Sequence, residues 1–191
     1  MTRGVDAVVE TLVLFVVVYA LELAAPMVGL PAAAFALALP LDVHPWTIAT
    51  SVYAHASVGH LIANAVALLV VGLLVARRTS RLRFHSFFLV TGALSGVATV
   101  LVGSVLGGAT AVLGASGAIL ALVGYLLAGN LATESLLGRV TLSGRVWAAV
   151  VVVLAVGVAI ATGGPHVALT AHVTGFLLGL GAGRLHVLRA R

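Results

Sequence analysis

Two polar side chains that stand in otherwise apolar segments have the chemistry of a nucleophile and its base. Ser116 lies in the run Gly114-Ala115-Ser116-Gly117, and His172 lies in the last apolar segment of the chain. A serine hydroxyl becomes a strong nucleophile only when a base removes its proton, and imidazole most often does so. These residues predict acyl transfer by a Ser–His pair, with Gly114 and Gly117 leaving room for a substrate backbone.

Acyl transfer also needs hydrogen-bond donors where negative charge develops on the substrate oxygen. His60 and Asn64 can both donate, and their spacing of four residues puts them on one face of a helix. The backbone N–H of Ser116, near the start of an expected helix, is another donor. His55 precedes His60 by five residues. On a helix this is a rotation of about 140°, so we expect His55 to face elsewhere, in a structural or water-holding role.

The segments that carry these residues are apolar enough to be solvated by lipid. The chain is 62% hydrophobic and 8% charged, whereas a soluble domain has about 25% charged residues. It has no cysteine, which excludes disulfides and thiolate metal sites. Its arginines form short clusters between apolar runs, which is how membrane topology is encoded, so we exclude nucleic acid as a partner.

The arginine clusters predict the topology of the chain. They comprise Arg3; Arg77, Arg78, Arg81 and Arg83; Arg139 and Arg145; and Arg184, Arg189 and Arg191. Each gap between clusters has room for one helix out and one back, because a span needs about 17–25 residues. The result is an all-α polytopic bundle of six transmembrane helices, a single membrane domain over residues 1–191. The positive-inside rule places both termini in the cytoplasm.

The apolar runs give approximate helix positions. We expect helices near Val8–Leu23, Val58–Ala76, Phe84–Val102, Ser116–Gly129, Trp147–Ala161 and Thr170–Leu188. A long outer loop, Ala24–Ser51, follows the first helix, and a glycine-rich stretch, Gly103–Leu113, precedes the fourth. Asp6 and Glu10 do not suit the positive start of a signal peptide, so the first segment is expected to remain as a helix.

The polar residues of three different helices are predicted to lie at one depth. Helical rise puts His172, Asn64 and Ser116 about 18, 20 and 21 Å from the cytoplasmic ends of their helices. In a hydrocarbon core of about 30 Å, all three lie roughly a third of the way in from the outer side. Ionisable and strongly polar groups at such depths are costly and usually functional.

Small residues repeat along one face of two of these helices. The stripes are Gly117, Ala121, Gly124 and Ala128 on the fourth helix, and Gly175, Gly179 and Gly183, following His172, on the sixth. Small residues at this spacing let transmembrane helices approach closely. If the stripes face each other, Ser116 and His172 come within hydrogen-bonding range.

Each of these features also has a less specific interpretation. A lone membrane serine usually bonds to a carbonyl of its own helix, an asparagine often joins helices, and a small-residue stripe is usually only a packing seam. No acid is expected at the depth of His172, because Glu134 is predicted on the cytoplasmic side and Asp42 in the outer loop. We therefore predict a Ser–His dyad rather than a triad.

Histidines in the expected outer loops raise metal binding as an alternative. His44 and His166 both fall in such loops. The chain has no H-E-x-x-H run and few outer carboxylates, so a zinc protease is not favoured. We expect no metal and no other cofactor.

Three motifs together resemble those of the rhomboid intramembrane proteases. The run from His55 to Asn64 fits that family's H-x4-H-x3-N pattern, Gly114–Gly117 fits G-x-S-G, and Ala171–Gly175 with Gly179 fits A-H-x-x-G-x3-G. Their order and the six-helix frame agree over nearly the whole chain. The sequence departs from the family at Thr47, where arginine often follows tryptophan, and at Leu120, where an aromatic residue is common.

The resemblance implies roles for these residues. Ser116 would be the nucleophile, His172 the general base and acid, and His60, Asn64 and the Ser116 N–H the oxyanion hole. It also implies a water-filled cavity open to the outside of the cell membrane. The partners would be the lipid bilayer and single-span membrane proteins, which enter sideways past the fifth helix and are cut near the outer end of the span.

Three functions remain open at the level of sequence. The first is an active serine endopeptidase, and the second is a catalytically inactive rhomboid-fold protein that binds membrane clients. The presence of both Ser116 and His172 favours the first. The third is a small transporter with a histidine proton relay, which no repeated pair of broken helices supports.

Overall fold

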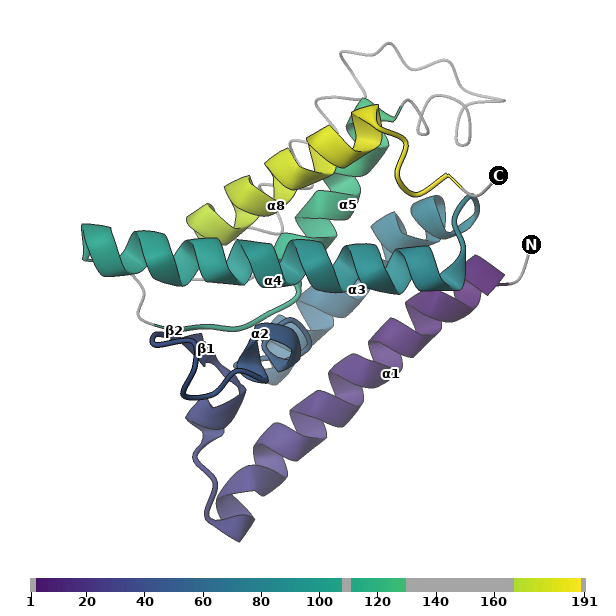
Figure 1. Cartoon of the computed structure of the whole chain (residues 1–191). Coiled ribbons are helices and arrows are strands. Elements are labelled where there is room, and N and C mark those ends of the chain that lie inside the picture. The colour runs from purple at the N-terminus through teal and green to yellow at the C-terminus, as the bar shows by residue number, and fades with distance from the viewer. Residues whose placement is uncertain (1–2, 108–110, 130–166, 190–191) are drawn as a thin grey trace.

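The computed structural model describes residues 3–107, 111–129 and 167–189 (Figure 1). The long helices are α1 (Arg3–Ala24), α3 (Val58–Ala76), α4 (Arg81–Leu106), α5 (Ser116–Ala128) and α8 (Val167–Arg184). The shorter elements are η1 (Ala25–Val28), η2 (Ala32–Phe35), β1 (Leu37–Ala38), α2 (Thr47–Thr50) and β2 (Ala111–Val112). The helix expected near Trp147–Ala161, together with Glu134, Arg139, Arg145 and His166, lies outside the described residues.

The apolar helices are those of a membrane protein. Three segments within the described residues, Val5–Val28, Val58–Ala76 and Arg81–Leu106, are long and apolar enough to cross a membrane. The shorter helix α5 is also apolar, and its 13 residues extend about 20 Å at the usual helical rise.

Serine caps explain where two of these helices begin. The Ser57 side chain accepts a hydrogen bond from the His60 N–H at 3.1 Å, so α3 begins at Val58 as predicted. The Ser80 side chain accepts from the Arg83 N–H at 3.4 Å, and α4 therefore begins at Arg81, earlier than predicted. The last helix, α8, starts and ends a few residues earlier than its predicted range.

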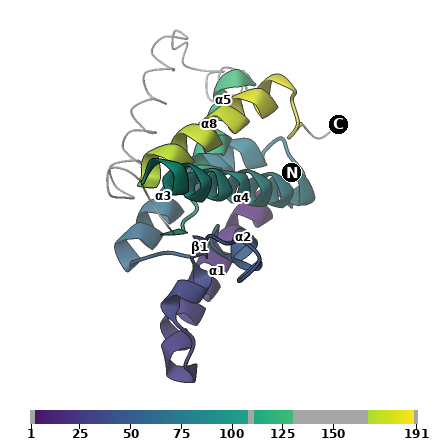
Figure 2. The same ribbon diagram turned by 60° about the vertical axis from the view of Figure 1, so that its left-hand side comes forward.

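Helix α5 forms the centre of the bundle. Every residue from Ser116 to Leu126 is buried, and α5 contacts α3, α4 and α8. Figures 1 and 2 show α8 running beside α5, while α1 lies on the other side of the bundle against α3 and α4. A short apolar helix wrapped by longer ones cannot expose its polar residues to lipid, so it is a suitable support for a site.

The backbones of α5 and α8 are in direct contact, as the two small-residue stripes predict. A Cβ atom at Gly175 would overlap the carbonyl group of Gly117, and one at Gly179 would overlap that of Ala121. At Gly183 a Cβ atom would come within 2.6 Å of the Tyr125 carbonyl oxygen. Only glycine permits this approach, because any side chain would force the helices apart.

The arginine-bearing helix ends gather at one end of the bundle. Figures 1 and 2 show the start of α1 near the start of α4 and the end of the described chain. Glu10 on α1 accepts from the Nε of Arg81 at 2.7 Å and lies 2.8 Å from the His85 Nε2. Arg83 donates to the carbonyl oxygen of Arg189. These contacts join α1, α4 and the C-terminal segment.

A small sheet at the opposite end is a feature that an all-α prediction omits. Strands β1 and β2 are antiparallel, with Leu37 opposite Val112 and Ala38 opposite Ala111. The Trp46 indole also donates to the Ala34 carbonyl at 3.0 Å. The loop between α1 and α3 is thus attached to the segment that precedes α5, although Thr47 replaces the arginine common in the resembled family.

Candidate active site

Ser116 is the first residue of α5 and directly follows a turn whose backbone is constrained at Gly114. Gly114 has φ +125°, a backbone conformation that residues with side chains rarely adopt. Its N–H donates to the Ser51 carbonyl oxygen at 2.8 Å, which ties the turn to the segment after α2. Ser116 itself is 9% exposed. Its backbone N–H belongs to the first helical turn, where no intrahelical acceptor exists, so it points toward the space before the helix.

His172 lies in the second turn of α8 and is 4% exposed. It follows Ala171, whose carbonyl oxygen would lie 3.4 Å from a Cβ atom at Gly117. Ser116 and His172 therefore flank the place where α5 and α8 touch. Within the described residues neither ring nitrogen of His172 has a hydrogen-bond partner, so no hydrogen bond joins the imidazole to Ser116. An unpaired buried imidazole is costly, which is typical of a group that bonds to a ligand or water.

His60 lies against the turn that precedes Ser116. A Cβ atom at Gly114 would come within 2.6 Å of the His60 Cε1 and 2.9 Å of its Nε2. Glycine at position 114 therefore serves both the positive φ and the close approach of the ring. This contact brings one of the predicted donors of α3, His60, against the turn that leads to Ser116.

Asn64 is fully buried one helical turn beyond His60. Its Nδ2 donates to the His60 carbonyl oxygen at 3.1 Å. The side-chain Oδ1 has no hydrogen-bond partner in the described part of the chain. An amide nitrogen carries two N–H groups, so this bond leaves the second for another acceptor.

The expectation that His55 faces away from His60 is wrong. The two rings are in edge contact, with centroids 5.2 Å apart, and the His55 ring also contacts Phe15, with centroids 4.7 Å apart. A helical rotation does not apply because α3 begins only at Val58. Burial, with a smaller contribution from His60, holds the pKa of His55 well below its usual range, so this ring is neutral at physiological pH.

Glu22 is a site neighbour that sequence reasoning missed. Its Oε2 accepts a hydrogen bond from the His55 backbone N–H at 2.9 Å, and the residue is 9% exposed. It fixes the segment that carries His55 against α1. The sequence held a sign of it, because a glutamate near the end of an apolar span is costly unless it has a partner.

The hydroxyl groups of α4 beside α5 are structural. Thr91, Ser95 and Thr99 are buried and donate to the carbonyl oxygens four residues earlier at 2.7, 2.7 and 2.8 Å. Ser95 packs against Gly117, where a Cβ atom would come within 2.7 Å of the Ser95 Cβ. Leu120, at a position where an aromatic residue is common in the resembled family, is a core residue with 2% exposure.

The side chains of the candidate site suit acyl transfer better than metal binding. Among the described residues there is no group of three or more histidine, cysteine, aspartate or glutamate side chains that could hold a metal ion. His44, a histidine of the predicted outer loop, is exposed. What the site does offer is a hydroxyl, a buried imidazole, and donors from α3 and the start of α5, which are the groups that acyl transfer requires.

The comparison with family models agrees with this arrangement. The model described as Rhomboid domain matches residues 42–189, which include all three motifs. No curated protein sequence matches the chain. The chain belongs to the rhomboid family, and it is a mostly helical membrane protein. Members of this family are typically intramembrane serine proteases.

Proposed function

We propose that this protein is an intramembrane serine endopeptidase that cleaves transmembrane segments of other membrane proteins. The observation that carries the proposal is the backbone contact between Gly117 and Gly175, since it fixes the helices of Ser116 and His172 against each other. Both residues are buried. A buried imidazole without a hydrogen-bond partner among the described residues is costly for stability, and catalysis would explain it.

The reaction follows from the groups in place. The Ser116 Oγ attacks the scissile carbonyl carbon while His172 accepts its proton, and His172 then gives that proton to the leaving amine. The Ser116 N–H, His60 and Asn64 stabilise the negative charge on the substrate oxygen. Water, activated in turn by His172, hydrolyses the acyl-enzyme. No carboxylate among the described residues bonds to the His172 imidazole, so we propose a dyad, for which slow turnover is expected.

The substrates we propose are single-span membrane proteins. In lipid every backbone group of a helix is already bonded internally, so a stable helix resists attack and local unwinding must come first. Ser116 and His172 both lie near the helix ends opposite the arginine clusters. With the arginines in the cytoplasm, cleavage takes place toward the outer side of the cell membrane.

The direct test is cleavage of a transmembrane reporter by the purified protein in detergent. We expect wild-type protein to cleave the reporter and Ser116→Ala protein not to cleave it. Ser95→Ala is the matched control, because Ser95 is a buried serine beside Gly117 that bonds to the carbonyl of its own helix. Equal cleavage by wild-type and Ser116→Ala protein would contradict the proposal.

A second candidate is an inactive rhomboid-fold protein that binds membrane clients. The observation in its favour is that no hydrogen bond joins His172 to Ser116 within the described residues. Catalytic hydrogen bonds are often long in a free enzyme and shorten when substrate binds, so we place this candidate second. Reporter that co-purifies uncleaved with wild-type protein would favour it.

A further inference from the structure

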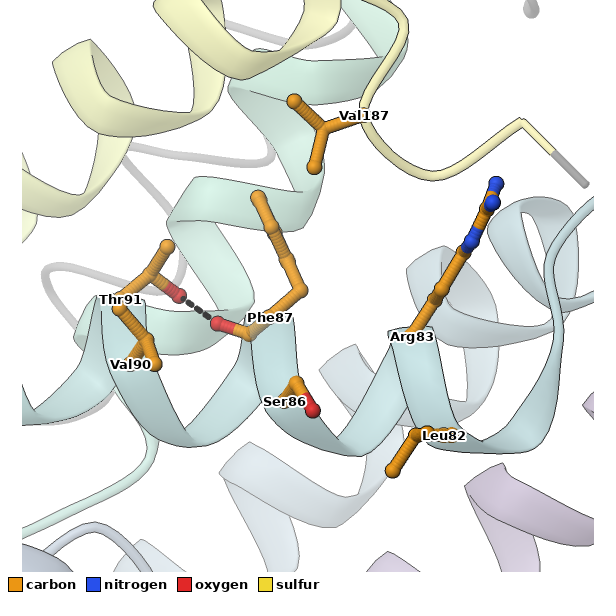
Figure 3. Close-up of a pocket in the computed structure, with 7 residues that line it drawn as sticks. All are labelled: Leu82, Arg83, Ser86, Phe87, Val90, Thr91 and Val187. Carbon is orange, nitrogen blue, oxygen red and sulfur yellow. Dashed lines mark hydrogen bonds between the residues drawn. The ribbon is translucent and has the colours of Figure 1, made fainter.

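An apolar groove lies at the arginine-bearing end of α4 (Figure 3). Its volume is about 390 Å³. The lining includes Leu82, Arg83, Ser86, Phe87, Val90 and Val187. Ser95, which packs against Gly117, lies further along α4, so the groove and the site occupy different parts of this helix.

Exposed apolar side chains line the sides of the groove. Leu82 is 76% exposed, Val90 54% and Val187 48%, whereas Phe87 is 7% exposed and forms the floor. Leu82 and Val90 lie on a helix that is long and apolar enough to span the membrane. Hydrocarbon is therefore the natural medium for these side chains.

Arg83 gives the groove a charged end. It donates to the Arg189 carbonyl oxygen, which holds its side chain toward the C-terminal segment, as Figure 3 shows. A guanidinium group has five N–H donors, so one such bond leaves donors for a phosphate. Seven residues separate Arg83 from Val90, which is about 10 Å along the helix. From the end of the bundle inward, the groove thus begins with the cation of Arg83 and continues as an apolar trough toward Val90.

We propose that this groove binds one anionic phospholipid, with its phosphate on Arg83 and an acyl chain along Phe87 and Val90. Basic pockets next to transmembrane helices attract the headgroups of anionic lipids. The chain as a whole carries a formal charge of +5, and arginines flank the groove in sequence on both sides. A free phosphate would use the arginine but would leave the apolar trough unfilled.

The test measures lipid retained on the purified protein in an uncharged detergent. Native mass spectrometry compares phosphatidylglycerol, phosphatidylcholine with the same acyl chains, and soluble glycerol phosphate. Wild-type protein should prefer phosphatidylglycerol over phosphatidylcholine by about fivefold, the contribution of one arginine near an anionic headgroup. Glycerol phosphate should neither bind measurably nor displace the lipid. Displacement by glycerol phosphate would overturn the proposal.

Variants locate the binding on the protein. Arg83→Gln should lose the preference for phosphatidylglycerol, and Arg83→Lys, which keeps the charge, should retain most of it. Val90→Trp fills the trough from an exposed position and should reduce the retention of both lipids. Arg77→Gln is the matched control, since it removes the same charge from the same end of the bundle but does not line the groove. Equal loss in Arg77→Gln, or no loss in both Arg83→Gln and Val90→Trp, would refute this site.

Discussion

A single methyl group at Gly175 should separate α5 from α8 and disable the site. In Gly175→Ala, the new Cβ atom would overlap the carbonyl group of Gly117, which belongs to the backbone and cannot rotate away. A carbon atom approaches a carbonyl oxygen no closer than about 3.3 Å, so the helices must move apart by roughly 1 Å. A misplacement of about 1 Å between reacting groups can lower a rate by about 100-fold.

The chain contains a matched control for this substitution. Gly181 is on the same helix, and a Cβ atom there would meet nothing within 4 Å. Gly181→Ala should leave cleavage unchanged and stabilise the helix by about 0.5–1 kcal/mol. Gly175→Ala should instead lose about 1–3 kcal/mol of stability through overpacking.

The assay is kcat/KM for a transmembrane reporter, measured beside thermal unfolding in the same detergent. The expected result is a loss near 100-fold for Gly175→Ala, about the effect of 1 Å on a reacting pair, and no loss for Gly181→Ala. Wild-type kcat/KM in folded Gly175→Ala protein would refute the reasoning. It would show that the helix contact does not set the distance between Ser116 and His172.

Three further substitutions address the support of the site. Asn64→Ala should lower kcat by an amount that corresponds to up to about 2–4 kcal/mol of lost transition-state stabilisation, if the amide is an oxyanion donor. An unchanged kcat would exclude that role for Asn64. Gly114→Ala should cost about 1–3 kcal/mol of stability, because an alanine would be strained at the φ of this position. The new Cβ atom would also strike the His60 ring. Thermal unfolding and reporter cleavage measure both effects. Glu22→Ala should cost about 1–3 kcal/mol of stability, since it leaves the buried His55 N–H without its acceptor. An unfolding midpoint equal to that of wild type would show that this bond contributes nothing.

The contact between α5 and α8 could be predicted because its cause is local in sequence. Glycines at three- and four-residue spacing report a close helix approach wherever the partner helix lies. The start of α3 could also be predicted, because Ser57 is a capping residue directly before an apolar run. These features need no knowledge of distant parts of the chain.

The contacts that were missed join residues far apart in the sequence. The β1–β2 pair links Leu37 to Val112, and no periodicity in either short segment indicates a strand. The orientation of His55 depends on where α3 begins and on Phe15 and Glu22 of α1. A helical wheel cannot supply such information, since it assumes that the segment is already helical.

The pairing of Ser116 with His172 can be measured through a thiol, because the chain has no cysteine of its own. Ser116→Cys protein has a single thiol, and its alkylation rate against pH gives the pKa of that thiol. A neighbouring imidazole takes up the thiol proton and, as imidazolium, stabilises the thiolate, so adding His172→Ala should raise the thiol pKa and slow alkylation near neutral pH. Superimposable pH profiles for the proteins with and without His172 would contradict the pairing.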